Sequence, residues 1–395
     1  MQINYIELKS SITPINKEHT DAFLHGIEEA GKFKLEKTEP ESYNHSDFCL
    51  IYVMTGGTEG LFLKNLDTFI QKPCYLLTSG ESNSLAASME ILSYLKSHGM
   101  KGEILHGDPC HIAGRILDLF RTETTLRRLR NSKAGWIGGS SEWLIDSDPD
   151  KDAYWNSLGI EIVEIPMTEL LSEISRGSYE PNIWTDKLLS LNYDRTEMEK
   201  ALNVYGAVKR LVLKYGLSAV TVKCFDLLST VHTTGCLALA ILNAEGIYAG
   251  CEGDMPSLIS MMILGEISQK PVFMCNLNRI DTAGNEMIFA HCTLPANMPY
   301  EMSLTTHYES GIGVAIAGSI PEEDFTIFKL SKDLKKYFAA EGKIIENRRE
   351  PELCRTQIKV SLDNFDYFLT DPIANHHLIC TGNYRSSLEN FFKSI

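Results

Sequence analysis

The sequence lacks long hydrophobic runs, and its N-terminus carries no apolar leader. The first residues, MQINYIELKSSITPINKEH, have no charged segment followed by an apolar core. No later stretch stays apolar long enough to cross a bilayer. We therefore expect a protein that does not act in a membrane and that is, by default, cytoplasmic.

Basic residues are scarce relative to acidic ones. The chain has 37 Lys and Arg against 52 Asp and Glu, which gives a formal net charge of -15 at pH 7. Contacts to nucleic-acid phosphates require clustered Lys and Arg, and the short basic run at residues 127–130 is typical of a solvated helix face. A nucleic-acid partner is therefore not expected.

Paired cysteines and nucleotide-binding glycine motifs are also missing. The ten cysteines occur singly in apolar contexts and none belongs to a Cys-x-x-Cys motif, so we expect reduced core residues instead of a disulfide scaffold or a zinc knuckle. The early loop at residues 55–60, TGGTEG, matches neither GxGxxG nor GxxxxGK[ST]. A turn that lines a ligand cleft is the favoured interpretation of this loop.

Length and pattern predict more than one domain. A chain of 395 residues is long for one core, and its first part alternates strand-like and helix-like runs at residues 3–8, 18–30, 48–54 and 83–97. This β-α-β alternation is typical of a parallel sheet covered by helices. We assign it to an N-terminal α/β domain at residues 1–131.

The same pattern repeats in a second α/β domain, which we place at residues 132–269. Its expected strands and helices lie at residues 134–139, 160–165, 196–215, 219–222, 236–243 and 247–251. Beyond it the sequence pattern changes to short strands separated by Gly and Pro turns. The expected strands lie at residues 271–276, 286–292, 313–317, 325–330, 356–362 and 377–380. The fold class is therefore predicted to be α/β, with two Rossmann-like parallel-sheet domains followed by a β-rich, barrel-like domain at residues 270–395.

The sequence concentrates its chemistry at residues 251–254, CEGD. Strand 247–251 delivers Glu252 and Asp254 to the carboxyl end of a parallel sheet, where open α/β sheets place their ligands. Two carboxylates beside a buried run are costly without a cation or a substrate proton to handle. Asp254 alone could instead cap the helix that starts at Met255 and Pro256, but Glu252 would gain nothing from capping. The pair therefore points to function.

Histidines from the β-rich part supply a second set of candidates. Alternation along a strand sends His376 and His377 to opposite faces, so one of them at most reaches a given metal. His291 lies on an apolar strand and His307 precedes Tyr308, and each could equally be a satisfied structural histidine. Carboxylates and imidazoles without a thiolate cluster suit a hard or borderline divalent ion such as Mn²⁺.

Such an ion indicates a class of chemistry. A cation that binds two adjacent oxygens of an open-chain sugar stabilises the negative charge that develops during proton removal, and a neighbouring carboxylate can carry the proton between carbons. This is the chemistry of aldose–ketose isomerisation.

Several segments resemble the L-fucose isomerase-like group of sugar isomerases. They are GIYAGCEGDMP at residues 246–256, PVFM at 271–274, HCTLP at 291–295, HYESG at 307–311 and ANHHLICTG at 374–382. The resemblance extends from about residue 134 to the C-terminus. It implies a three-domain α/β protein with a Mn²⁺ site between the second sheet and the β-rich domain, and a homo-oligomer whose active sites borrow residues from a neighbouring subunit.

Residue roles follow from this resemblance. Asp254 matches the group's metal-binding carboxylate, His376 matches its C-terminal histidine ligand, and His291 occupies a strand on which arabinose-isomerase relatives carry a ligand. The better-known members also have a catalytic acid on the helix before the CEGD strand, but residues 236–242 contain none. Either Glu252 or Asp226 fills that role, or proton transfer is impaired.

The resulting hypothesis is a metal-dependent isomerase of a free sugar or deoxysugar that works through an ene-diol, with a small-molecule sugar as its partner. The candidate residues are, for metal binding, Glu252, Asp254, His291 and His376; for catalysis, Glu252 as proton shuttle together with Asp254 and Asp226; and for substrate binding, His307 and His377. One alternative is a non-catalytic sugar-binding or sugar-sensing protein. Another is a redox protein that uses Cys251 or Cys292.

Overall fold

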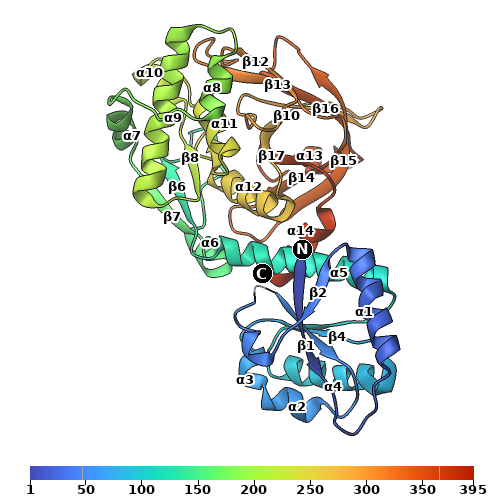
Figure 1. Ribbon diagram of the computed structural model, residues 1–395. Coiled ribbons are helices and arrows are strands. Elements are labelled where there is room, and N and C mark those ends of the chain that lie inside the picture. Colours follow the sequence, from blue (N-terminus) through green and yellow to red (C-terminus); the bar gives the residue numbers. More distant parts are fainter. Residues whose placement is uncertain (47, 364) are drawn as a thin grey trace. The chain divides into compact units, whose positions relative to one another are not determined.

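The structure is a computed structural model that describes residues 1–46, 48–363 and 365–395. Its contacts divide the chain into two compact units, Met1–Thr124 and Thr125–Ile395, which are considered separately (Figure 1). Within the described residues, no helix combines the length and apolar character needed to cross a membrane.

The first unit is a parallel sheet covered by helices. The sheet has the order β2-β1-β3-β4-β5, and all of its neighbouring strands run parallel. Its strands are β1 (Gln2–Leu8), β2 (Lys34–Lys37), β3 (Cys49–Val53), β4 (Cys74–Leu77) and β5 (Gly102–Leu105). The helical segments are α1 (Lys17–Gly31), η1 (Pro40–Ser42), α2 (Glu59–Lys64), α3 (Leu66–Phe69), η2 (Glu81–Asn83), α4 (Ser84–Ser97) and α5 (Pro109–Leu129), the last of which leads into the second unit. Every residue of β3 and β4 is buried, as expected for central strands covered on both faces.

The second unit begins with another parallel sheet, of order β7-β6-β8-β9. Its strands are β6 (Lys133–Ile137), β7 (Glu161–Ile165), β8 (Ala219–Val222) and β9 (Tyr248–Cys251). Its helices are α6 (Lys151–Leu158), α7 (Met167–Ile174), α8 (Ile183–Leu189), α9 (Arg195–Tyr215), α10 (Asp226–Thr230), α11 (Cys236–Ala244) and α12 (Met255–Ser268). Helix α12 is buried on all sides except at Glu266, which explains why its sequence is apolar all round.

A closed antiparallel barrel follows in the same unit, with the order β10-β11-β16-β15-β14-β17. Its strands are β10 (Phe273–Asp281), β11 (Glu286–His291), β14 (Asp324–Leu330), β15 (Tyr337–Arg348), β16 (Thr356–Ser361) and β17 (His376–Thr381). The ribbon β12 (Glu301–Thr305) and β13 (Ala315–Ser319) and the helices α13 (Phe365–Thr370) and α14 (Arg385–Ser394) complete the unit. The predicted fold class, with two parallel sheets and a β-rich C-terminal region, is confirmed.

Helix α12 joins the second sheet to the barrel. It contacts β9 on one side and the barrel strands β14 and β17 on the other (Figure 1). The carboxyl end of β9 therefore lies beside the first residues of β17. The three-domain division, with boundaries after residues 131 and 269, stays a prediction.

Candidate metal centre

The turn after β9 has a backbone conformation that few residues adopt. Glu252 has a φ of 61° and Gly253 a φ of 69°, both in the left-handed region. A Cβ on Gly253 would lie 1.9 Å from the carbonyl oxygen of Gly139, so only glycine fits there. Asp254 then begins helix α12 as its N-cap, with its side chain accepting a hydrogen bond from the backbone N–H of Ser257.

Three buried side chains from distant parts of the chain converge next to this turn. The Oε1 atom of Glu252 lies 3.5 Å from Nε2 of His376 and 3.8 Å from Nε2 of His291. One potential ligand atom from each residue lies within 4.8 Å of those of the other two. Glu252 comes from the β9 turn, His291 ends β11 and His376 begins β17. We call Glu252, His291 and His376 the metal triad.

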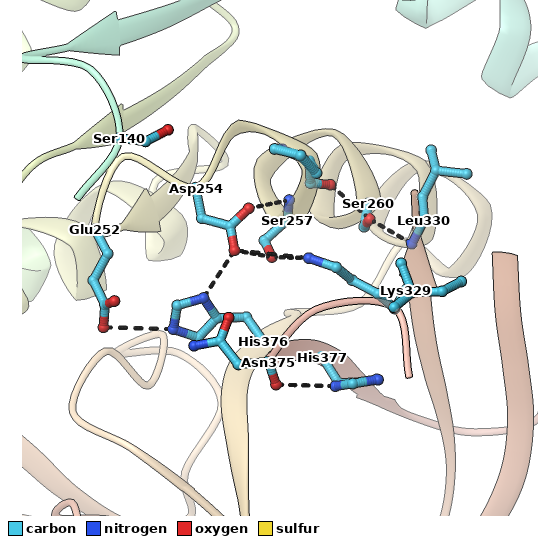
Figure 2. Close-up of polar contacts among 12 residues, drawn as sticks. Ser140, Glu252, Asp254, Ser257, Ser260, Lys329, Leu330, Asn375, His376 and His377 are labelled. Atoms are coloured by element: carbon cyan, nitrogen blue, oxygen red, sulfur yellow. Dashed lines mark hydrogen bonds and ion pairs between the residues drawn. The ribbon is translucent and has the colours of Figure 1, made fainter. Parts of the chain in front are cut away.

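Asp254 lies behind His376, on the side of the imidazole that faces away from Glu252. Its Oδ2 is 2.8 Å from Nδ1 of His376, as Figure 2 shows. A carboxylate at this nitrogen holds the proton on Nδ1 and turns Nε2 toward the metal triad. The two carboxylates of the CEGD segment therefore contact opposite sides of one imidazole.

A fully buried lysine supports Asp254. Lys329, on β14, places its Nζ 3.7 Å from Oδ2 of Asp254 and donates a hydrogen bond of 2.5 Å to Oγ of Ser257 (Figure 2). The hydroxyl of Ser257 in turn donates to Oδ2 of Asp254 at 2.7 Å. Burial alone would raise the pKa of Asp254, but the charges of Lys329 and His376 outweigh it and lower the pKa below its usual range. Asp254 therefore stays ionised.

Electrostatics favour the charged forms of Glu252 and His376. Burial opposes the charge of Glu252, but its contacts with His291 and His376 prevail and lower the pKa of this carboxyl well below its usual range. Burial also opposes the charge of His376, yet Asp254 and Glu252 together raise its pKa to about 9. Without a metal ion, the proton on His376 thus offsets the negative charge of Glu252 and Asp254.

The donor set fits a divalent metal ion. Among the described residues, Nε2 of His376 is a buried polar atom with no hydrogen-bond partner, and it faces Glu252 and His291, the other two members of the metal triad. A buried nitrogen of this kind is costly unless it binds a proton or a cation. Two imidazole nitrogens and a carboxylate oxygen are ligands that suit Mn²⁺, Zn²⁺ or Fe²⁺.

Aromatic residues border the metal triad. The indole N–H of Trp143 donates a 2.6 Å hydrogen bond to Oε2 of Glu252, and its ring meets Phe225 edge-on with 4.8 Å between the ring centroids. Phe225 also packs edge-on against His307, at 5.5 Å. Burial, assisted by the charge of His291, lowers the pKa of His307 to about 4, so this imidazole is neutral near pH 7.

Besides Asp254 and His307, two further residues expected at the site, Asp226 and His377, lie outside the metal triad. Asp226 begins α10, and its carboxylate is 3.8 Å from Nζ of Lys223. His377 points to the other face of β17, where Nε2 contacts the hydroxyl of Tyr367 at 3.0 Å. Its Nδ1 contacts the carbonyl of Asn375 at 3.1 Å (Figure 2). The alternation expected for adjacent strand residues thus separates His376 from His377.

The cysteines of the redox alternative are buried. Sγ of Cys251 lies 2.8 Å from Sγ of Cys224, at the ends of neighbouring strands, and both thiols are free. Cys292 is also buried and free. Neither Cys251 nor Cys292 belongs to the metal triad.

A separate cavity of about 550 Å³ lies at the opposite end of β9, near Tyr248, Lys270 and Arg128. None of its lining residues belongs to the metal triad.

Comparison with known proteins reveals similarity to proteins named sulfoquinovose isomerase. The chain is 22% identical to the one from Alkalicoccus urumqiensis over 219 residues, which cover 53% of this chain and 49% of that protein. It is 21% identical to the one from Priestia aryabhattai over 310 residues, covering 71% of this chain and 68% of that protein. The aligned region thus spans between about half and about two thirds of these relatives. No family model matches the chain.

These relatives support a connection with sugar isomerases in general. Their names do not single out the L-fucose isomerase-like group that the sequence segments resemble. The finer family assignment therefore stays a prediction.

Proposed function

We propose that this protein is a divalent-metal-dependent aldose–ketose isomerase that acts on a sugar. The observation that carries the proposal is the metal triad, in which Nε2 of His376 has no hydrogen-bond partner and lies 3.5 Å from Oε1 of Glu252. The similarity to proteins named sulfoquinovose isomerase supports the reaction class.

In this proposal Glu252, His291 and His376 hold the metal ion. When bound, the ion would act as a Lewis acid that stabilises negative charge developing on the sugar oxygens during proton removal. Asp254 acts on the ion indirectly, because it fixes the tautomer and orientation of His376. Trp143 orients Glu252 through its N–H hydrogen bond.

The carboxylate of Glu252 is poorly suited to shuttle the proton. Its Oε2 already accepts the hydrogen bond from Trp143, and its Oε1 faces Nε2 of both His376 and His291. We therefore assign Glu252 to the metal ion and not to proton transfer.

The experiment that tests the proposal is a substrate panel. Purified protein is incubated with free aldoses, deoxyaldoses and sulfoquinovose, with added Mn²⁺ or after treatment with a chelator, and ketose formation is followed by NMR. We expect ketose from at least one aldose, lost on chelation and restored by Mn²⁺. Ketose formation that survives complete metal removal would refute the metal dependence.

A second measurement addresses the sugar-binding alternative. Exchange of the C2 proton with solvent deuterium shows whether a bound aldose is deprotonated. Binding of sugar to the metal-loaded protein with neither exchange nor ketose would refute the isomerase and favour the non-catalytic protein. The cytoplasmic location and the homo-oligomer with shared active sites stay predictions, and sedimentation of the purified protein tests the second.

A further inference from the structure

The proposed reaction requires a carboxylate that is close to the metal triad but not committed to other partners. Glu252 is assigned to the metal ion, and Asp254 is fully buried with its oxygens bound to Ser257 and His376. Asp226 is near the ammonium of Lys223. These three acids, which the sequence offered as catalytic candidates, therefore leave the role of base unfilled.

Glu309 is a carboxylate without such commitments. It lies in the loop between β12 and β13, and its side chain is 55% exposed. Its Oε2 is 3.8 Å from Nε2 of His307, and the described residues show no other ion-pair partner for this carboxylate. The oxygens of Glu309 are thus accessible to a ligand.

A continuous set of contacts connects Glu309 with the metal triad. His307 packs against Phe225, Phe225 against Trp143, and Trp143 donates its hydrogen bond to Glu252. The electrostatic influence of the triad also reaches this carboxylate. Burial raises the pKa of Glu309 and the negative charge of Glu252 raises it further against an opposing influence of His291, which brings this carboxyl closer to the range suited to a general base.

His307 is arranged to position Glu309. Nδ1 of His307 contacts Oγ of Ser310 at 3.0 Å and the backbone N–H of Ser310 at 3.4 Å, and accepting from that N–H places the proton of the neutral imidazole on Nε2. The Nε2–H group is on the side of the ring nearest to Oε2 of Glu309. A nucleophile or base oriented by a second side chain is a common arrangement in active sites.

We propose that Glu309 is the base that moves the substrate proton, with His307 as its positioning residue; this inference rests on the proposed isomerase function. The C2–H bond of the aldose breaks and the proton goes to an oxygen of Glu309, while the electron pair forms the C1=C2 bond and the π pair of the C1=O bond moves onto O1 to give the ene-diolate. Glu309 then returns the proton to C1, while the hydroxyl proton of O2 moves to O1 and C2 becomes the carbonyl. Atoms and charges balance without an oxidant or a reductant.

The test compares Glu309→Gln with Glu301→Gln, a change of an exposed acid on β12 of the same unit. General-base catalysis contributes about 10²- to 10⁴-fold. We therefore expect kcat and C2 proton exchange to fall by that factor in Glu309→Gln, while Mn²⁺ affinity and KM stay within about twofold of the wild-type values. Glu301→Gln should match the wild type.

Chemical rescue separates a base from a structural residue. Formate added to Glu309→Ala should restore part of the lost turnover, because a small carboxylate can occupy the vacated space. Wild-type turnover in Glu309→Gln, or a loss of Mn²⁺ binding parallel to the loss of kcat, would overturn the inference but leave the isomerase function standing. A wild-type protein that converts no aldose would overturn the proposed function and this inference with it.

Discussion

Replacing Asp254 by Asn tests whether this carboxylate binds the metal ion or acts through His376. Asn is as good an N-cap as Asp, so the start of α12 should persist. The change removes the negative charge 2.8 Å from Nδ1 of His376. A hydrogen bond to a charged group contributes about 1.5–3 kcal/mol, which corresponds to about 10- to 100-fold in the Kd for Mn²⁺. The same range is typical when a carboxylate that orients a ligand histidine is lost.

The assay is isothermal titration of metal-free protein with Mn²⁺, with His291→Ala as the comparison because it removes a proposed ligand. We expect Asp254→Asn to bind Mn²⁺ about 10- to 100-fold more weakly than the wild type and more tightly than His291→Ala. Binding lost as completely as in His291→Ala would show that Asp254 is itself a ligand. A Kd within about twofold of the wild type would refute the orienting role.

Because Lys329 pairs with Asp254, the Asp254→Asn change should also lower the free energy of unfolding. Asp254→Asn leaves a fully buried ammonium without its carboxylate, and breaking a buried pair costs about 3–5 kcal/mol of unfolding free energy. Adding Lys329→Met, of similar volume, should recover most of this stability in urea denaturation without restoring Mn²⁺ affinity. If the double variant regained both, the loss of metal binding would be a consequence of misfolding.

Three further predictions concern the same site. The raised pKa of His376, about 9 against 6.5, stabilises the metal-free protein fully below pH 6.5 and progressively less up to pH 9. Urea denaturation should therefore show a loss of about 3 kcal/mol over this window, absent from His376→Gln. Trp143→Phe removes the N–H donor to Glu252 and should weaken Mn²⁺ binding about 3- to 10-fold by titration. Trp155→Phe, which changes an exposed side chain on α6, should leave Mn²⁺ binding unchanged. Gly253→Ala should destabilise the protein by more than about 3 kcal/mol because the new Cβ meets Gly139, whereas Gly216→Ala, also at positive φ but in open space, should cost about 1 kcal/mol.

The parts of the fold that sequence predicted best are those whose local pattern matches their burial. Strands β3, β8 and β9 are short apolar runs buried in parallel sheets, and the expected ranges 48–54, 219–222 and 247–251 match them closely. Strand β15 was not predicted. Its exposed and charged residues, its Gly342 and its irregular pairing between Ile344 and Glu346 obscure the alternation of a strand.

Some residues of the candidate site could likewise be predicted from the sequence, and others could not. Residue chemistry singled out Glu252 and Asp254, the resemblance to sugar isomerases added His291 and His376, and the structure brings all four together. No feature of the sequence indicated that Lys329 belongs to the site, because a lysine between Phe328 and Leu330 in an alternating strand is usually exposed. Its burial depends on how β14 packs against α12, which is a tertiary contact that the sequence pattern does not contain.

The turn conformation explains why the two carboxylates of the CEGD segment have different contacts. In a regular strand, residues two apart share a face, so Glu252 and Asp254 would point at one ligand. The left-handed backbone at Glu252 and Gly253 breaks this relation, and Asp254 instead starts a helix and contacts the far side of His376. A non-glycine residue held at positive φ is strained, and such strain persists where the surrounding structure fixes it. We infer that this strain is retained because it places one acid at the metal triad and the other behind its histidine.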